Sequence, residues 1–392
     1  MLAEILELEK TFDSLLPLGQ QQERTDTLLM EAGKQWSQAI WQKAKHLGGL
    51  PFSQQAIEDA FNFSERAIFI CGSERSGTTL LRNLLDAHPQ LSVLPSEGTY
   101  ITQLEKKLLR LPQDARCEFL CREWLWRMVL SMHQPPFWLL GKSTLQHSLY
   151  LDFARAFIGW WPIVKERCGH NNTQWPFVVL QLAFATSQHQ TGSSLQELYW
   201  VEKTPNNEQY LDRILQDFPK AKIIQTIRNP IDVLRSNKPH ETLSTVSKYS
   251  FIRNLKASFN IAGKQLLKND KHHLLVRYED LCTNPALTMQ QVAAFIGIRY
   301  MDDLLLPTVV GKPTGPNSSF KQTGASGKII AVKDRVQEDR LTVKDHQLLA
   351  ASLHGLTETF GYYLPPIGMV HKQLLRVDAF AQRVLNKLKR MA

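Results

Sequence analysis

The segment AIFICGSERSGTTLLRNLLDAH, residues 67–88, is the most informative part of the chain for its fold. Its first six residues, 67–72, are mostly apolar, rich in residues that favour strands, and end in a glycine, which predicts a buried strand. From Thr79 onward leucines recur at helical spacing, and this pattern ends before Pro89. The segment therefore predicts a strand, a glycine-containing turn and a helix in direct succession.

Further strands are predicted downstream, with helical sequence between them. The runs are LYWVEK (198–203), KIIQTIR (222–228) and HHLLVRYEDL (272–281), the last leaving its sheet at Tyr278. Helical patterns lie near 210–218 and 287–296. Strands that alternate with helices favour an α/β fold with a mostly parallel central sheet flanked by helices.

The remaining sequence predicts helical additions to this core. We expect an N-terminal helical segment over residues 1–65, a core over 66–345 and a C-terminal helical tail over 346–392. Within the core, residues 101–195 read as a helical insertion, which contains six of the nine tryptophans. Breaks in this insertion are expected at its prolines: Pro112, Pro135, Pro136, Pro162 and Pro176.

Composition limits the class of protein. The chain has 392 residues, is 43% hydrophobic and 21% charged, and carries a net charge of +9, which favours an anionic ligand. Five scattered cysteines with no C-x-x-C pair indicate neither a zinc site nor a disulfide framework. The start, MLAEILELEKTF, lacks the features of a secretory signal, and no apolar run is long enough to cross a bilayer. We therefore expect a cytoplasmic protein.

The turn after the first strand has the features of a phosphate-binding loop. Residues 72–79, GSERSGTT, resemble the P-loop pattern G-x-x-x-x-G-K-[ST], but Thr78 replaces the lysine. Backbone N–H groups in such a loop, the start of the next helix and the hydroxyls of Thr78 and Thr79 can all hold a phosphate, with Arg75 as a cationic fork. Without the lysine, the loop suits a single 5′-phosphate better than a triphosphate. The alternative is a helix-capping turn that binds nothing.

A second anion site is predicted in RNPIDVLRS, residues 228–236. Arg228 follows a strand directly, at the edge where open α/β sheets bind ligands, and Ser236 lies eight residues later, about two helical turns away. The alternative is an arginine paired with Asp232 and a surface serine. Two separate anion sites match 3′-phosphoadenosine 5′-phosphosulfate (PAPS), whose transferable group is a sulfuryl; this also explains the missing lysine and metal-binding carboxylate.

At this point the sequence resembles the PAPS-dependent sulfotransferase family, in the branch of bacterial and tyrosylprotein sulfotransferases. Four motifs occur in the family's order between about residues 66 and 330: RSGTTLLRNLLDAHP (75–89), RNPIDVLRS (228–236), VRYEDL (276–281) and NSSF (317–320). The resemblance implies a P-loop nucleotide-binding, sulfotransferase-like fold.

The resemblance also implies roles for individual residues. The 5′-phosphosulfate would be held by Arg75, Ser76, Gly77, Thr78 and Thr79, and the 3′-phosphate by Arg228 and Ser236. The nucleotide would be lined by Tyr278, Ser318 and Ser319. Glu97 matches the family's catalytic base if one inserted residue is allowed, and Lys203 in VEKTPNN matches a functional lysine. His240 stands where many members have a further arginine, and Lys238 is the candidate substitute.

The expected reaction is in-line transfer of the sulfuryl group to a hydroxyl of a small metabolite, saccharide or lipid. Glu97 would act as general base, with a pKa raised by burial, while Lys203 and Arg75 stabilise charge and no metal takes part. Two alternatives remain: a P-loop kinase, which Thr78 argues against, and a non-catalytic nucleotide- or polyanion-binding protein. No nucleic-acid recognition motif accompanies the charge.

Two properties of the chain stay open at this stage. The sequence does not indicate an oligomeric state. The basic amphipathic pattern from residue 371 onward is a candidate for weak contact with an anionic membrane surface or a partner, or for a docked helix with a solvated basic face.

Overall fold

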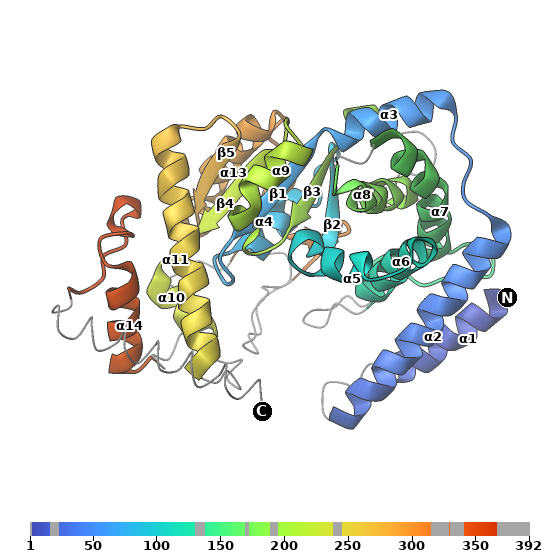
Figure 1. Cartoon of the computed structure of the whole chain (residues 1–392), viewed down its shortest axis with the longest axis horizontal. Helices are drawn as coiled ribbons and strands as arrows, with labels where there is room; N and C mark the ends of the chain where they lie inside the picture. Colours follow the sequence, from blue (N-terminus) through green and yellow to red (C-terminus); the bar gives the residue numbers. More distant parts are fainter. Residues whose placement is uncertain are drawn as a thin grey trace.

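A five-stranded parallel sheet forms the centre of the molecule (Figure 1). The computed structural model describes residues 2–15, 23–129, 138–168, 172–188, 195–237, 245–314, 329 and 341–366. The strand order is β2-β3-β1-β4-β5, and every neighbouring pair is parallel. The strands are β1 (Ala67–Gly72), β2 (Leu91–Glu97), β3 (Tyr199–Lys203), β4 (Lys222–Ile227) and β5 (His273–Arg277). The predicted α/β fold with a mostly parallel sheet is confirmed.

Of the five strands in the central sheet, β2 is the one that the sequence analysis did not predict. It pairs only with β3, at one edge of the sheet, and its register is irregular between Val93 and Glu97. Pro95 lies in this irregular part. Proline cannot donate a ladder hydrogen bond, and an edge strand tolerates it because one side of that strand is unpaired. The proline and two serines interrupt the apolar pattern, so the sequence analysis did not recognise a strand whose first five residues are buried.

Helices cover both faces of the sheet, and further helices lie beside its two edge strands, β2 and β5 (Figure 1). The α-helices are α1 (Leu2–Leu15), α2 (Glu23–Leu47), α3 (Gln54–Ser64), α4 (Thr78–Leu85), α5 (Glu105–Leu109), α6 (Gln113–Val129), α7 (Leu149–Cys168), α8 (Trp175–Gln188), α9 (Leu211–Asp217), α10 (Pro230–Asn237), α11 (Thr245–Lys268), α12 (Tyr278–Thr283), α13 (Pro285–Ile296) and α14 (Val343–Leu353). Shorter elements are a π-helix at Tyr100–Leu104, 3₁₀ turns at Leu195–Glu197, Asn207–Tyr210, Asp302–Leu305 and Glu358–Phe360, and a hairpin of β6 (Thr308–Val309) and β7 (Lys312–Pro313).

Alternation along β1 divides the interior into two cores. Ile68 and Ile70 face a core that contains α4 and α13, whereas Ala67, Phe69 and Cys71 face a larger core. The larger core also contains buried residues of the N-terminal helices and of the insertion helices α6 to α8. A third cluster joins the end of β4 to α10, α11 and α14. Figure 1 shows the insertion beside β2 and α11 with α14 beyond β5.

The insertion is helical as predicted, but the expected break at Pro162 is wrong. Pro162 lies inside α7 on its exposed side, where water can bond the freed carbonyl. The break expected at Pro176 lies directly before it, since α8 begins at Trp175 and Pro176 occupies its first turn, where no intrahelical N–H is needed. Pro112 does separate α5 from α6, and Pro135 and Pro136 lie outside the described residues. Trp124 and Trp160 are fully buried in the core.

The N-terminal helices α1 and α2 pack against the insertion. Trp36 of α2 is fully buried, and its indole N–H donates to the buried Glu9 carboxylate of α1 at 3.4 Å. The second Glu9 oxygen accepts the backbone N–H of Ser143, at 3.2 Å. These helices and the insertion share one hydrophobic core. The predicted boundary between an N-terminal segment and the core at residue 65 stays a prediction. None of the described helices is both long and apolar enough to span a bilayer.

Gly159→Ala in α7 is expected to destabilise the protein. An alanine Cβ there would lie 2.5 Å from the Leu50 carbonyl oxygen and 2.9 Å from the Phe52 ring. The forced displacement costs about 1–3 kcal/mol, which outweighs a gain of about 1 kcal/mol in helix propensity. Urea unfolding should show a lower free energy of unfolding.

Gly263→Ala in α11 is the matched control, because its Cβ would meet only Phe360, at 4.0 Å. It keeps the propensity gain and should raise the free energy of unfolding by up to about 1 kcal/mol. Equal effects of the two substitutions would contradict close packing at Gly159.

Candidate active site

The residues predicted to act on the ligand gather at one edge of the sheet. The loop 72–79 follows β1, Glu97 and Lys203 end β2 and β3, and Arg228 and Tyr278 directly follow β4 and β5. Because all five strands are parallel, their carboxyl ends lie along the same edge. This edge is where open α/β sheets bind ligands.

The loop after β1 has a backbone that approaches its neighbours unusually closely. Gly72 and Gly77 have φ angles of 134° and 101°, and Arg75 has a φ of 66°. A Cβ on Gly77 would lie 2.3 Å from the Tyr278 ring, so only glycine fits there. No side chain caps α4, which leaves its first N–H groups available to an anion.

Ser76 supports this loop from beneath. Its side chain is fully buried; its hydroxyl donates to the Ser73 carbonyl at 2.6 Å and lies 2.8 Å from the Thr226 hydroxyl. Its backbone N–H also donates to Ser73, at 3.2 Å. The buried Glu208 carboxylate accepts the N–H of Gly72 at 2.9 Å. These contacts fix the loop on β4 and on the turn after β3.

The arginine after β4 lies beside the loop. The guanidinium of Arg228 donates to the Arg75 carbonyl at 3.2 Å and lies 4.4 Å from the centre of the Tyr278 ring. Asp232, the alternative partner from the sequence, pairs with Arg235 instead. Ser236 lies in the last turn of α10, half-buried.

Glu97 and Lys203 form an ion pair across the ends of β2 and β3. The Lys203 ammonium donates to Glu97 Oε1 at 2.7 Å; its side chain is 2% exposed, whereas that of Glu97 is 46% exposed. Burial raises the pKa of Glu97, but Lys203, with Arg82 and Arg127, lowers it by more, so the pKa lies below the ordinary 4.5. The expected rise in this pKa is therefore wrong, because the carboxylate lies among cations.

Comparison with known proteins assigns the chain to a family. The profile of the sulfotransferase family matches residues 67–303, more than half of the chain. The chain belongs to the sulfotransferase family. Membership confirms the predicted resemblance and the expectation of a transferase of sulfuryl groups, and it implies PAPS as co-substrate. A search of curated proteins gave no significant match.

Several solved structures are similar to this sulfotransferase. The sulfotransferase domain of the Synechococcus PCC 7002 olefin synthase is 21% identical, with 76% of this chain and 95% of that chain covered and a TM-score of 0.46. The sulfotransferase domain from the curacin biosynthetic pathway is 18% identical, with 76% and 98% covered and a TM-score of 0.41. Sulfotransferase STF1 of Mycobacterium tuberculosis H37Rv is 20% identical, with 77% and 86% covered and a TM-score of 0.38.

The structure places further residues beside these candidates that the sequence analysis missed. Arg82 lies within the first motif, and its guanidinium donates to the Pro95 carbonyl at 2.8 Å. Glu202 is adjacent to Lys203 and buried, and burial raises its pKa to about 7. Arg127 comes from α6 and had no sequence signal, since it lies 30 residues after Glu97 in the tryptophan-rich insertion.

Several of the predicted features lie outside the described residues. They are Ser318, Ser319, Lys238, His240 and the basic tail from residue 371. Within the described part of the chain, no group of three or more His, Cys, Asp or Glu side chains could hold a metal ion.

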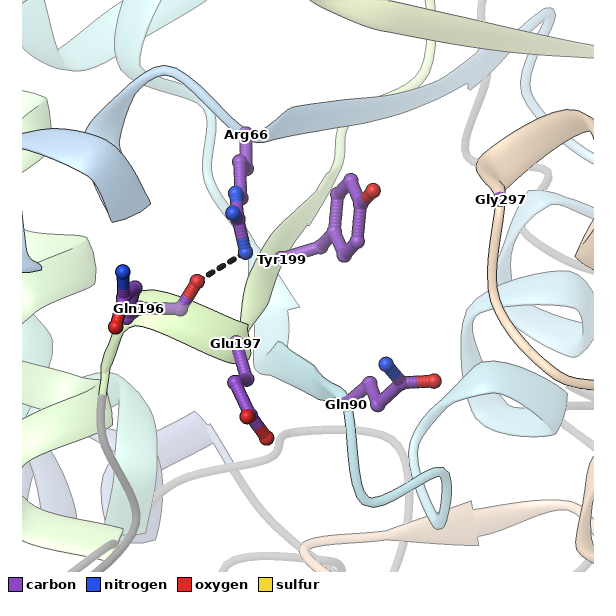
Figure 2. Close-up of a pocket in the computed structure, with 6 residues that line it drawn as sticks. All are labelled: Arg66, Gln90, Gln196, Glu197, Tyr199 and Gly297. Atoms are coloured by element: carbon purple, nitrogen blue, oxygen red, sulfur yellow. Dashed lines mark hydrogen bonds between the residues drawn. The ribbon is translucent and has the colours of Figure 1, made fainter.

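An open hollow of about 510 Å³ lies at the opposite, amino-terminal edge of β1 to β3 in the sulfotransferase (Figure 2). In it, the Arg66 guanidinium donates to the Gln196 carbonyl. It is lined by Arg66, Gln90, Gln196, Glu197, Tyr199 and Gly297. It is therefore separate from the edge that carries the ion pair and the loop.

Gly77→Ala is expected to weaken nucleotide binding strongly. The added Cβ would collide with the Tyr278 ring at 2.3 Å, and the φ of 101° disfavours any side chain, so the loop must change shape. Calorimetry with adenosine 3′,5′-bisphosphate should show an affinity lower by roughly 100-fold or more, equivalent to about 3 kcal/mol.

Gly311→Ala is the control for backbone strain alone. Gly311 also has a positive φ, 69°, but an added Cβ would meet no atom within 4 Å, and the residue lies in the β6–β7 turn. Its affinity for the nucleotide should equal that of the unchanged protein. An equal loss in both variants would show that the contact with Tyr278 is unimportant.

Proposed function

We propose that this sulfotransferase moves the sulfuryl group of PAPS to a hydroxyl acceptor, with Glu97 as general base. The observation that carries the proposal is the Glu97–Lys203 ion pair, 2.7 Å long, at the same sheet edge as the phosphate loop. A half-exposed carboxylate next to a buried ammonium suits proton removal beside a site of developing charge.

The loop and the β4 end suit the two anionic groups of this donor. The 5′-phosphosulfate would be held by the uncapped start of α4, with the Arg75 side chain and the hydroxyls of Thr78 and Thr79. Arg228 and Ser236 would hold the 3′-phosphate, with the Tyr278 ring beside the nucleotide. Ser76 would act by keeping the loop in shape, because its hydroxyl and its N–H are bonded within the protein.

Each proposed catalytic residue has a separate task. When bound, PAPS supplies the sulfuryl group and a good leaving phosphate. Glu97 would accept the acceptor's proton, and its low pKa keeps it ionised near neutral pH. Lys203 and Arg75 would hold negative charge as it moves toward the leaving nucleotide. The buried position of Lys203 shields its charge from water, which strengthens the interaction.

The proposed general base indicates the reacting group of the acceptor. A general base calls for a proton-bearing nucleophile, and we propose a hydroxyl of a small metabolite, saccharide or lipid. A P-loop kinase is disfavoured by Thr78 at the position of the phosphate-binding lysine. A cytoplasmic location and absence of a metal remain predictions from the sequence.

The deciding experiment incubates the protein with ³⁵S-labelled PAPS and a panel of hydroxyl acceptors. Label transferred to an acceptor supports the proposal. Tight binding of adenosine 3′,5′-bisphosphate with no transfer to any acceptor would favour the non-catalytic nucleotide-binding alternative, and Mg²⁺-dependent transfer from ATP would favour the kinase.

Glu97→Gln should lower kcat by roughly 10²–10⁴-fold, the usual effect of losing a positioned base. Affinity for adenosine 3′,5′-bisphosphate should remain within a few-fold. In the unchanged protein a base acts only when deprotonated, so activity should fall with decreasing pH only below 4.5, the ordinary glutamate value. Rate measurements from pH 4 to 9 check kcat and its pH dependence, and calorimetry checks the affinity. An unimpaired variant would remove Glu97 from this role.

Arg228→Ala should weaken adenosine 3′,5′-bisphosphate much more than adenosine 5′-phosphate, which lacks the 3′ group. Loss of a hydrogen bond to a charged group costs about 1.5–3 kcal/mol, which corresponds to roughly 10- to 150-fold in affinity. Calorimetric titration with both nucleotides tests this, and equal losses would contradict a 3′-phosphate site at Arg228.

A further inference from the structure

The turn that carries Glu97 has a backbone that needs support from its surroundings. Pairing of β2 with β3 is irregular between Val93 and Glu97. Two residues later, Thr99 has a φ of 47°, which a β-branched residue rarely adopts. Such a conformation persists only where neighbouring groups hold it in place.

On the sheet side, two residues at the end of β3 and directly after it supply part of this support. The Glu202 carboxylate accepts the N–H of Gly98 at 3.1 Å, and the Thr204 hydroxyl accepts the N–H of Thr99 at 2.8 Å. The same hydroxyl donates to Glu202, so these two side chains form one buried network.

On the other side, a single arginine of the insertion holds the same turn. Arg127 Nη1 donates to the Glu97 carbonyl at 3.0 Å and to the Thr99 hydroxyl at 2.8 Å. Arg127 lies in the last turn of α6, and its guanidinium pairs with Glu123 at 3.0 Å and lies 5.7 Å from the Trp124 ring centre. Its side chain is only 18% exposed, so the geometry is well fixed.

We propose that Arg127 is a positioning residue for Glu97, which couples helix α6 of the insertion to the reacting carboxylate. The two hydrogen bonds set the turn from which the Glu97 side chain projects. A displacement of α6 therefore displaces the carboxylate. The proposal rests on the proposed function, since it assigns Arg127 an effect on the base of that reaction.

Arg127 also belongs to a set of charged groups around Glu97. Among the described residues, the charged groups that interact with Glu97 include Lys203 and Glu202 from β3, Arg82 from α4, Glu74 and Arg75 from the loop, and Arg127 from α6. Against the rise due to burial, Lys203, Arg82 and Arg127 lower the pKa of Glu97. Removing the Arg127 charge is therefore expected to raise this pKa. Removing a residue that only held the turn in place would not have this effect.

The test measures kcat, the pH dependence of kcat/KM, and affinity for adenosine 3′,5′-bisphosphate in Arg127→Met and Arg127→Lys. Arg127→Met should lower kcat roughly 10- to 100-fold through misplacement of the base. It should also move the acidic limb of kcat/KM upward by up to about one pH unit. Nucleotide affinity should remain unchanged. Arg127→Lys keeps the charge, so its acidic limb should stay in place and part of kcat should return.

Two further variants on α6 sharpen the test. Glu123→Gln leaves the Arg127 charge uncompensated and should move the acidic limb downward, opposite to Arg127→Met. Arg122→Met removes an arginine from the same helix that pairs in the same way with the residue four positions earlier, Glu118. This control should leave the acidic limb and kcat unchanged.

Four results would overturn the proposal. They are an acidic limb that Arg127→Met leaves in place, equal effects of Arg127→Met and Arg122→Met, a loss confined to nucleotide affinity, and a shift in the same direction for Glu123→Gln. If Arg127→Met does not fold, Arg127→Lys and Glu123→Gln carry the test. Failure of the proposed function is seen separately, as absence of transfer by the unchanged protein or full activity of Glu97→Gln.

Discussion

The ammonium group of Lys203 is buried at the end of β3, and the arrangement of the neighbouring strand ends depends on the ion pair that neutralises it. Glu97 provides the opposite charge, at 2.7 Å, from the edge strand β2. Leaving such a buried charge unpaired costs about 3–5 kcal/mol. The pairing therefore favours an end of β2 beside β3 in spite of the irregular register and Pro95. The same pairing places a partly exposed carboxylate next to the phosphate loop, which is the arrangement that the proposed reaction uses.

The phosphate loop depends on a second constraint, close contact between backbone and side chains. Tyr278, directly after β5, fills the space that a side chain on Gly77 would need, and the Arg228 guanidinium lies 4.4 Å from the centre of the same ring. The loop, the β4 end and the β5 end are thus packed on one another. A change in any of them alters the others, so the two proposed anion sites form one unit.

The sequence predicted those parts of the protein whose signals are local. β1, β4 and β5 appear as short apolar runs, and the loop, Arg228 and Tyr278 follow them directly. β2 was missed because Pro95 interrupts its apolar pattern, although it carries Glu97. The direction of the Glu97 pKa shift was missed for a different reason. The cations that cause it come from three elements far apart in the sequence, at residues 82, 127 and 203, and only the fold brings them together.

The N-terminal helices α1 and α2 share the large core with the insertion, and Trp36 and Glu9 hold the segment around Ser143 against them. The described side chains of these helices include none of the candidate site residues. They nevertheless cover the outer side of α6, the helix that ends at the Glu97 turn. On the proposed role of Arg127, a substitution in α2 that shifts α6 would therefore move the Glu97 turn, although α2 itself lies away from that turn.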